Sequence, residues 1–209
     1  MLSRFRLLFV FVLLAPAAGL IRMAGHAPDP FWPSFFLTWL AFGMVVWLSH
    51  QRWSLSLALL LAGLIAHGAG VAWVGEAFLV DAERFGHLRH ASVVLLGLVL
   101  ALTDLIAFLL VWRRGGSFLA SLARAILALS LGELLRRVIL GGFPWNLQAY
   151  ALADTGLDQW VYLAGSHGLP LLLGPFLLAF VWAVSRRYYQ LSLLHLFLLA
   201  GFALWGNQR

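Results

Sequence analysis

The sequence predicts an all-α fold, a polytopic bundle of membrane-spanning helices with a cytoplasmic N-terminus and an extracytoplasmic C-terminus. Apolar residues make up 63% of the 209-residue chain, charged residues make up 11%, and the mean hydropathy is +0.93. These values lie well beyond the composition of soluble globular proteins. The apolar residues also form runs of the roughly 20 residues that a helix needs to cross a bilayer core about 30 Å thick.

About seven such runs follow one another along the chain. We expect each to be a helix, because a segment inside the bilayer must satisfy its own backbone hydrogen bonds. No linker or clear internal repeat divides the sequence, so residues 1–209 are expected to form a single membrane domain. The predicted spans cover residues 5–21, 33–48, 54–74, 91–112, 118–140, 160–184 and 191–205.

The first run also has features of a cleaved signal peptide. Arg4 and Arg6 precede an apolar stretch that ends at Pro16, Ala17 and Ala18. We favour an uncleaved first span, because the chain goes on crossing the membrane after it.

The placement of the arginines predicts the orientation of the spans, since short loops rich in basic residues stay in the cytoplasm. If successive spans alternate in direction, more of the loop arginines fall on one side of the membrane than on the other. We expect that side to be the cytoplasmic one. The bias is modest, because other arginines lie at or near the opposite face. The arginines on the predicted cytoplasmic side are Arg4, Arg6, Arg52, Arg113, Arg114, Arg186 and Arg187.

The basic composition also excludes several kinds of chemistry. All 14 basic residues are arginines, and the chain contains no cysteine. A thiolate nucleophile, a Schiff-base lysine, a disulfide and a cysteine-ligated metal are therefore excluded within these residues. The net charge of +6 does not indicate a nucleic-acid partner, because the arginines are spread over loops where topology and anionic headgroups explain them. No cofactor is expected.

One charged stretch near the outer end of the fifth span is costly in a membrane and is therefore a candidate site. Glu133 lies three and four residues before Arg136 and Arg137, so all three can pair on one helix. They form either a self-neutralising helix end, from which Arg137 reaches the headgroups, or a headgroup clamp below an aromatic lid. The residues of that lid would be Phe143 and Trp145.

These residues resemble a known family. Glu133-x-Leu135-Arg136, followed by Gly142-Phe143-Pro144-Trp145 and Tyr150, is similar to the signature in the membrane domain of bacterial apolipoprotein N-acyltransferase. Two weaker matches support it, Trp73-Val74 with Phe85-Gly86, and Leu163-Ala164 with Gly168. The resemblance covers roughly residues 30–185. The acidic loop from Glu76 to Glu83 is longer than the family's loop.

The resemblance implies a multi-pass protein of the bacterial inner membrane that takes part in lipoprotein maturation or lipid handling. The family carries a nitrilase-like catalytic domain with a glutamate, lysine and cysteine triad after these spans, whereas this chain ends at Arg209. We therefore expect no catalytic residue here, and partners that include phospholipid and a separate nitrilase-like subunit or a lipoprotein. The candidates for a lipid-facing or docking role are Glu133, Arg136, Arg137, Phe143, Pro144, Trp145, Tyr150 and Trp73.

A metal or haem protein is the alternative function. His67, Glu133 and His167 are predicted to lie at about the same depth, roughly 10 Å below the outer ends of their helices, where they could ligate a metal such as iron. Separate hydrogen bonds of each histidine within a packed bundle remain the favoured interpretation. A weaker second metal candidate in the outer loop consists of Glu83, His87 and His90.

Asp104 in the fourth span and Arg124 in the fifth form a predicted structural ion pair. Counted from the inner ends of their spans, they lie at depths of about 12 and 9 Å. A short connection makes the two spans antiparallel neighbours, and an isolated charge inside the membrane costs at least about 2.5 kcal/mol. We therefore expect the two side chains to pair.

Overall fold

The structure is a computed structural model that describes residues 2–26, 30–49, 51–139, 141, 143 and 145–206, with side chains from residue 5 onward. Every regular element in these ranges is helical, which confirms the all-α class. Six helical segments are long and apolar enough to cross a membrane, and a shorter apolar helix accompanies them. The protein is therefore a multi-pass membrane protein.

The seven predicted spans correspond to seven helical segments. The first span is one continuous run of three elements, α1 (Leu2–Phe9), the π-helical turn η1 (Val10–Leu14) and α2 (Ala15–Met23). The second is the short helix α3 (Ser34–Leu48), and the third is α4 (Arg52–Gly70). The remaining four are α6 (Arg89–Val111), α7 (Phe118–Ile139), α8 (Val161–Ser185) and α9 (Tyr189–Gly206).

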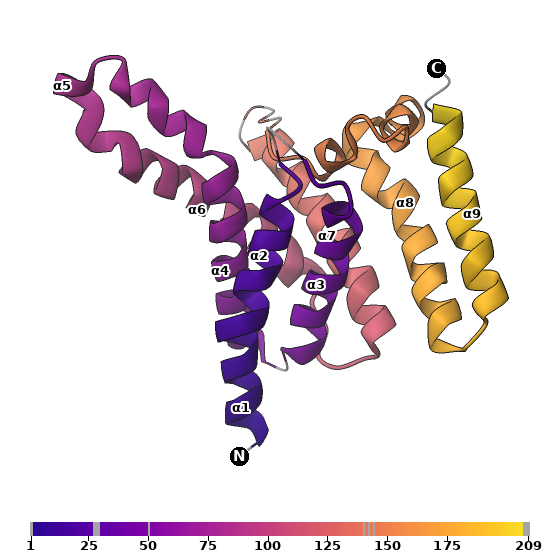
Figure 1. Cartoon of the computed structure of the whole chain (residues 1–209). Helices are drawn as coiled ribbons and strands as arrows, with labels where there is room; N and C mark the ends of the chain where they lie inside the picture. The colour runs from indigo at the N-terminus through magenta and orange to yellow at the C-terminus, as the bar shows by residue number, and fades with distance from the viewer. Residues whose placement is uncertain are drawn as a thin grey trace.

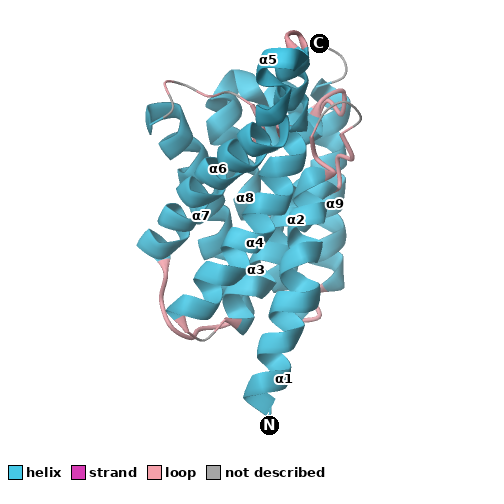
Figure 2. Ribbon diagram, turned by 90° about the vertical axis from the view of Figure 1, so that its left-hand side faces the viewer, coloured by secondary structure: helices cyan, strands magenta, loops and turns pink. Residues whose placement is uncertain are grey.

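The two termini lie at opposite ends of the bundle (Figure 1), as an odd number of crossings requires. The connecting loops gather at these two ends (Figure 2). We call the end that holds the N-terminus the inner end and the opposite end the outer end. Which end faces the cytoplasm stays a prediction from the arginine bias.

Small residues let the central helices approach closely. A Cβ atom on Gly97 of α6 would lie 3.0 Å from the backbone of Gly68 in α4, and one on Gly63 would lie 2.9 Å from the Cβ of Ala101. Close backbone approach at small residues is a main source of helix association in membranes, where lipid removes the hydrophobic driving force between helices. The contacts therefore hold α4 and α6 together along their length.

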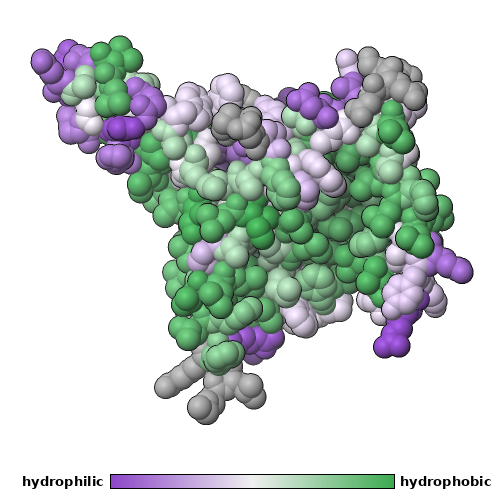
Figure 3. Space-filling model, viewed as in Figure 1, coloured by the Kyte–Doolittle hydropathy of each residue, from purple (hydrophilic) through white to green (hydrophobic). Residues whose placement is uncertain are grey.

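The last two helices form a hairpin beside this core (Figure 1). Aromatic contacts join their outer ends, with the ring of Trp160 4.6 Å from that of Phe202 and 5.2 Å from that of Trp205. Gly165 interrupts the helical geometry of α8 with φ of 69°. Most of α9 is exposed apolar surface, and the middle of the molecule is apolar on the face shown in Figure 3, as a lipid-facing surface requires.

At the outer end, two connections are themselves helical. The connection between α4 and α6 contains η2 (Ala72–Leu79), α5 (Ala82–Phe85) and η3 (Gly86–Leu88), and Figure 1 shows it extending away from the bundle. The connection between α7 and α8 contains the short 3-10 helices η4 (Gln148–Leu152) and η5 (Leu157–Trp160). These two connections carry the predicted aromatic site residues Trp73, Phe143, Trp145 and Tyr150.

Candidate functional site

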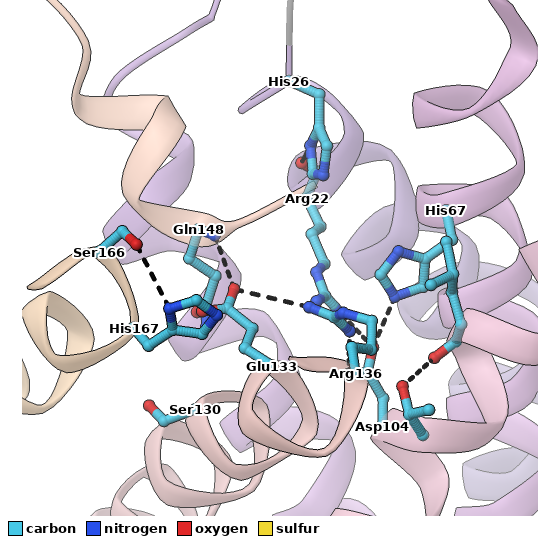
Figure 4. Close-up of polar contacts among 12 residues, drawn as sticks. Arg22, His26, His67, Asp104, Ser130, Glu133, Arg136, Gln148, Ser166 and His167 are labelled. Carbon is cyan, nitrogen blue, oxygen red and sulfur yellow. Dashed lines mark hydrogen bonds and ion pairs between the residues drawn. The ribbon is translucent and has the colours of Figure 1, made fainter. Parts of the chain in front are cut away.

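A buried cluster of charged side chains lies in the outer half of the bundle, centred on Asp104 of α6 (Figure 4). Asp104 is 2% exposed. Its Oδ2 accepts a hydrogen bond from Arg22 Nη1 at 2.5 Å and lies 2.7 Å from His67 Nε2. Its Oδ1 accepts from Arg136 Nη1 at 2.8 Å. One carboxylate thus joins α2, α4, α6 and α7, and both of its oxygens have partners.

The predicted pair of Asp104 with Arg124 is wrong. Arg124 Nη1 instead donates to the backbone oxygens of Arg113 at 3.0 Å and Gly115 at 3.1 Å, at the inner end of the bundle. The residue of α7 beside Asp104 is Gly132, whose Cβ position would lie 2.4 Å from Asp104 Oδ1. Arg124 lies eight residues earlier in the helix, roughly 12 Å away along its axis. Its long side chain therefore extends to the inner loop.

Glu133 connects this cluster to the outer segment that follows α7. Its Oε1 accepts the backbone N–H of Gln148 at 2.7 Å and lies 3.7 Å from Arg136 Nη2. The Oε1 of Gln148 in turn accepts from Trp39 Nε1 of α3 at 2.6 Å. Glu133 and Arg136 are candidates for a lipid-facing or docking role, and both are 0% exposed, so neither side chain faces lipid. Glu133 holds the outer segment from below through Gln148, and Arg136 contacts Glu133 and Asp104.

The two outer connections place aromatic rings on the surface, Trp145 from the segment after α7 and Trp73 from η2. Trp145 and Trp73 are 48% and 54% exposed, and their rings form a T-shaped contact with centroids 5.5 Å apart. Between them and the bundle, the buried Asn146 has φ of 61° and packs its side chain against Gly70 at the end of α4. Tyr150 is also exposed. We call Trp73, Trp145 and Tyr150 the outer aromatic surface.

The structure describes two of the three remaining residues of the predicted lipid-facing or docking set. Arg137 is exposed at the outer end of α7, and Phe143 is half-buried. Pro144 lies outside the described residues. Of the predicted set, Glu133 and Arg136 are thus buried, Phe143 is half-buried, and the exposed members are Arg137, Trp145, Tyr150 and Trp73. The 3.7 Å contact of Glu133 with Arg136 and the exposure of Arg137 fit a self-neutralising helix end, and the headgroup clamp stays a prediction.

A small cavity adjoins Arg22 beneath the outer segment, and polar atoms without a protein partner surround it. The cavity volume of about 10 Å³ is close to what one water molecule requires. The unpartnered buried atoms are Arg22 Nε and Nη2, His26 Nε2, Ser34 Oγ and Gln148 Nε2, and all four residues line the cavity. His26 Nδ1 lies 2.8 Å from the backbone oxygen of Arg22, so it donates there, and Nε2 is an acceptor. This set of donors and acceptors suits one bound water.

His26 lies between the first two spans and is held neutral. Burial, followed by the nearby Arg22 guanidinium, lowers the pKa of His26 from its ordinary value of 6.5 to about 4. Desolvation disfavours the charged form of a histidine, and a neighbouring positive charge has the same effect. The imidazole is therefore an uncharged neighbour of the cluster at neutral pH.

The predicted metal ligands do not converge. Within the described ranges, no three His, Asp or Glu side chains lie close enough together to hold a metal ion, and this applies equally to Glu83, His87 and His90. His67 contacts Asp104, whereas Glu133 binds the backbone of Gln148. His167 contacts Ser166 within α8, with its Nδ1 3.3 Å from the hydroxyl oxygen. Equal depth does not bring these side chains to one point, because their helices direct them toward different partners.

Sequence reasoning missed three residues of the cluster region, Arg22, Gln148 and Trp39. Arg22 lies just beyond the first predicted span, which ends at residue 21, but α2 continues to Met23 and carries Arg22 inside the bundle. A helical pattern extended by one turn would have found it. Gln148 and Trp39 give no comparable signal, since their contact joins residues 109 positions apart.

The chain is similar to known proteins over most of its length. Residues 18–176 match the model of the apolipoprotein N-acyltransferase N-terminal domain. An apolipoprotein N-acyltransferase from Rhodopseudomonas palustris is 32% identical over 94% of this chain and 39% of the relative, and one from Rhizobium etli is 31% identical over 77% and 32%. A third, from Brucella suis, is 38% identical over half of this chain. The chain spans less than two fifths of the length of these curated relatives.

Proposed function

This chain belongs to the apolipoprotein N-acyltransferase N-terminal domain family, and we propose that residues 1–209 form one membrane domain of the bacterial inner membrane that serves lipoprotein maturation. In this proposal the domain presents a lipid-facing setting to a nitrilase-like unit that performs the chemistry. The 209 residues contain no cysteine and no lysine, so they lack two members of the catalytic triad that the resemblance implies.

One observation carries the proposal beyond the family match. The exposed ring of Trp145 lies on the segment after α7, which the Glu133–Gln148 hydrogen bond of 2.7 Å holds from below, and it contacts the exposed ring of Trp73 on the α4–α6 connection. Buried charged groups in a membrane protein are costly and are retained where a function needs them. Here the buried cluster holds an exposed aromatic surface at the outer end. Aromatic residues on a rigid base are typical of interfaces that bind a partner or lipid headgroups.

The partners proposed for this surface are a phospholipid and the nitrilase-like unit. Tryptophan and tyrosine favour the membrane–water interface, where a phospholipid donor and a lipid-modified protein would both lie. The exposed guanidinium group of Arg137 at the outer end of α7 would suit a phosphate group. In this proposal Glu133 and Arg136 act as positioning residues and do not contact substrate.

Reconstitution in proteoliposomes tests the division of labour. The assay supplies a phospholipid with a labelled acyl chain and a lipid-modified peptide acceptor, and it compares the 209-residue chain, a soluble nitrilase-like catalytic domain from a relative, and both together. We expect acyl transfer only in the combined sample. Transfer by the 209-residue chain alone, or a catalytic domain that gains nothing from its presence, would overturn the proposal.

Trp145→Ala tests the outer aromatic surface in the same assay. This ring is about half exposed, so its removal is expected to leave the fold intact. Loss of an aromatic anchor at an interface costs about 2 kcal/mol or more, which corresponds to roughly a 30-fold loss of affinity for the catalytic domain. The matched control is Trp53→Ala, which removes a similarly exposed ring at the inner end. An equal effect of the two substitutions would contradict a specific role for the outer surface.

A further inference from the structure

Within the described part of the chain, the inner end of the molecule carries arginines and no acidic residue. The structure describes seven of the eight Asp and Glu residues of the chain, and all seven lie in the outer connections or in the buried cluster. The inner segments 1–9, 49–54, 111–124 and 184–191 together contain eight arginines. An uncompensated basic surface at a membrane boundary attracts anionic lipid headgroups. These arginines are not equivalent, however, because some are already bound to the protein.

The arginines at the inner ends of α4 and α7 use their guanidinium groups within the protein. Arg52 lies 5.5 Å from the ring centre of Trp112 and donates to the backbone oxygen of Leu109 at 3.4 Å. Arg124 donates to two backbone oxygens of the α6–α7 loop. Contacts of this kind stabilise loops and leave fewer donors for a ligand.

The turn between α8 and α9 differs. Arg186 and Arg187 are both exposed, and within the part of the chain that the structure describes neither guanidinium has an ion-pair or hydrogen-bond partner. Figure 3 shows hydrophilic atoms at the inner end of this hairpin, directly below its apolar surface. Two adjacent guanidinium groups with all their donors free can bind a phosphate group through bidentate hydrogen bonds.

The backbone of the turn provides an independent observation. Arg187 has φ of 62°, in the left-handed region that disfavours side chains with a Cβ atom. Glycine would adopt this conformation without strain. A strained position that nevertheless carries a long cationic side chain is a sign that the side chain itself is needed.

Aromatic rings complete the site. Tyr188 and Tyr189 are exposed beside the arginines, and the ring of Trp182 lies 5.6 Å from that of Tyr188. Residues 187–191 line a shallow hollow at this point. Tyrosine and tryptophan lie preferentially at the level of the headgroups, so the rings and the arginines occupy the depth at which a lipid phosphate is found.

We propose that the α8–α9 turn binds the headgroup of an anionic phospholipid in the inner leaflet, with Arg186 and Arg187 as its phosphate ligands. The surrounding surface supports an anionic over a zwitterionic lipid, because no Asp or Glu among the described residues lies at this end to repel a net negative headgroup. The site is distant in the chain from the outer aromatic surface, and it does not depend on the function proposed for that surface.

Lipid binding to the purified 209-residue chain in neutral detergent tests the proposal. Native mass spectrometry would compare phosphatidylglycerol with phosphatidylcholine for the wild type, R186Q/R187Q and the matched control R113Q/R114Q. The control removes the same charge from another exposed arginine pair at the same end. Each arginine near anionic lipid contributes about fivefold in affinity, so R186Q/R187Q is expected to weaken phosphatidylglycerol binding roughly 25-fold. The control R113Q/R114Q is expected to leave this binding near the wild-type value. Equal losses in both variants, or no preference for phosphatidylglycerol, would overturn the proposal.

R187G provides a second test, in which a loss of lipid binding cannot be explained by a less stable protein. Glycine relieves the backbone strain at φ of 62° while removing one proposed ligand. We expect a higher melting temperature in neutral detergent together with about a fivefold weaker binding of phosphatidylglycerol. Unchanged lipid binding in R187G would show that the Arg187 side chain is not a ligand.

Discussion

Arginines occur in two opposite environments in this protein. In the outer half, Arg22 and Arg136 are almost fully buried and share the carboxylate of Asp104. At the inner end, Arg186 and Arg187 are exposed on the α8–α9 turn. The buried pair cannot exchange partners without leaving a charge inside the bundle, whereas the exposed pair is free to bind a ligand. The same residue type is therefore structural in one region and a candidate for recognition in the other.

The difference follows from the cost of burying charge. A buried ion pair is itself weak evidence of stability, because desolvation offsets much of its attraction. Removing one member, however, leaves an uncompensated charge and is strongly destabilising. An exposed arginine has no such penalty, because water solvates it in the absence of a partner. Substitutions in the two regions should therefore differ most in the free energy of unfolding.

Asp104→Asn gives the largest expected effect. It removes the charge that neutralises Arg22 and Arg136 and weakens the contact with His67. Breaking a buried charge network in this way costs about 3–5 kcal/mol of unfolding free energy. SDS titration followed by tryptophan fluorescence would measure the loss. The control Glu83→Gln removes an exposed acid and should change stability by no more than about 0.5 kcal/mol. Similar values for the two variants would refute the central role of Asp104.

Lowering the pH should destabilise the outer region through His26. The pKa of this histidine is about 4 in the folded protein and 6.5 in an unfolded chain, so the unfolded state binds more protons between these values. Stability contributed by neutral His26 is therefore complete above pH 6.5 and falls by up to about 3 kcal/mol as the pH approaches 4.

His26→Gln isolates this contribution, because glutamine does not titrate. The difference in unfolding free energy between wild type and variant should shrink as the pH falls from 7 to 4. A difference that is constant with pH would show that His26 does not titrate with the pKa given by its environment.

Gly132→Ala tests how tightly the cluster is packed. The new Cβ atom would lie 2.4 Å from Asp104 Oδ1 and would force the carboxylate to move. Overpacking of this kind costs about 1–3 kcal/mol. Gly201→Ala in α9 is the matched control, since nothing lies within 4 Å of its Cβ position and alanine favours a helix by up to about 1 kcal/mol. The two substitutions should thus shift the melting temperature in opposite directions.

R186Q/R187Q should have the smallest effect on stability. Because both side chains are exposed and form no ion pair or hydrogen bond with other described residues, the free energy of unfolding in neutral detergent should change by no more than about 0.5 kcal/mol. A larger loss would mean that the inner arginines are structural, as the outer ones are, and the contrast between the two regions would disappear.

Much of the fold was predictable because its signals are local. The seven spans follow from runs of apolar residues, and the all-α class follows from the need to satisfy backbone hydrogen bonds inside the membrane. The family was recognisable from the short signature around Glu133, Arg136 and Trp145 and is confirmed by the match over residues 18–176. The boundaries were less accurate, since α2 extends to Met23 and thereby includes Arg22.

The partners of the charged residues could not be predicted in the same way. Depth along a helix follows from 1.5 Å per residue, but the direction of a side chain depends on how each helix is rotated and which helix lies beside it. Similar depths therefore predicted a pair of Asp104 with Arg124, whereas Gly132 is the residue of α7 that lies beside Asp104. The same limitation led to the prediction of His67, Glu133 and His167 as a metal site.

Composition and local pattern by themselves determined that this chain is a multi-pass helical membrane protein of a recognisable family, without lysine or cysteine chemistry. Only the tertiary structure decided that Asp104 joins residues 82, 37 and 32 positions away, and that Glu133 supports the outer aromatic surface from below. The physical reason is that hydropathy acts on each segment independently, whereas a buried charge must find its partner on whichever helix packing brings next to it.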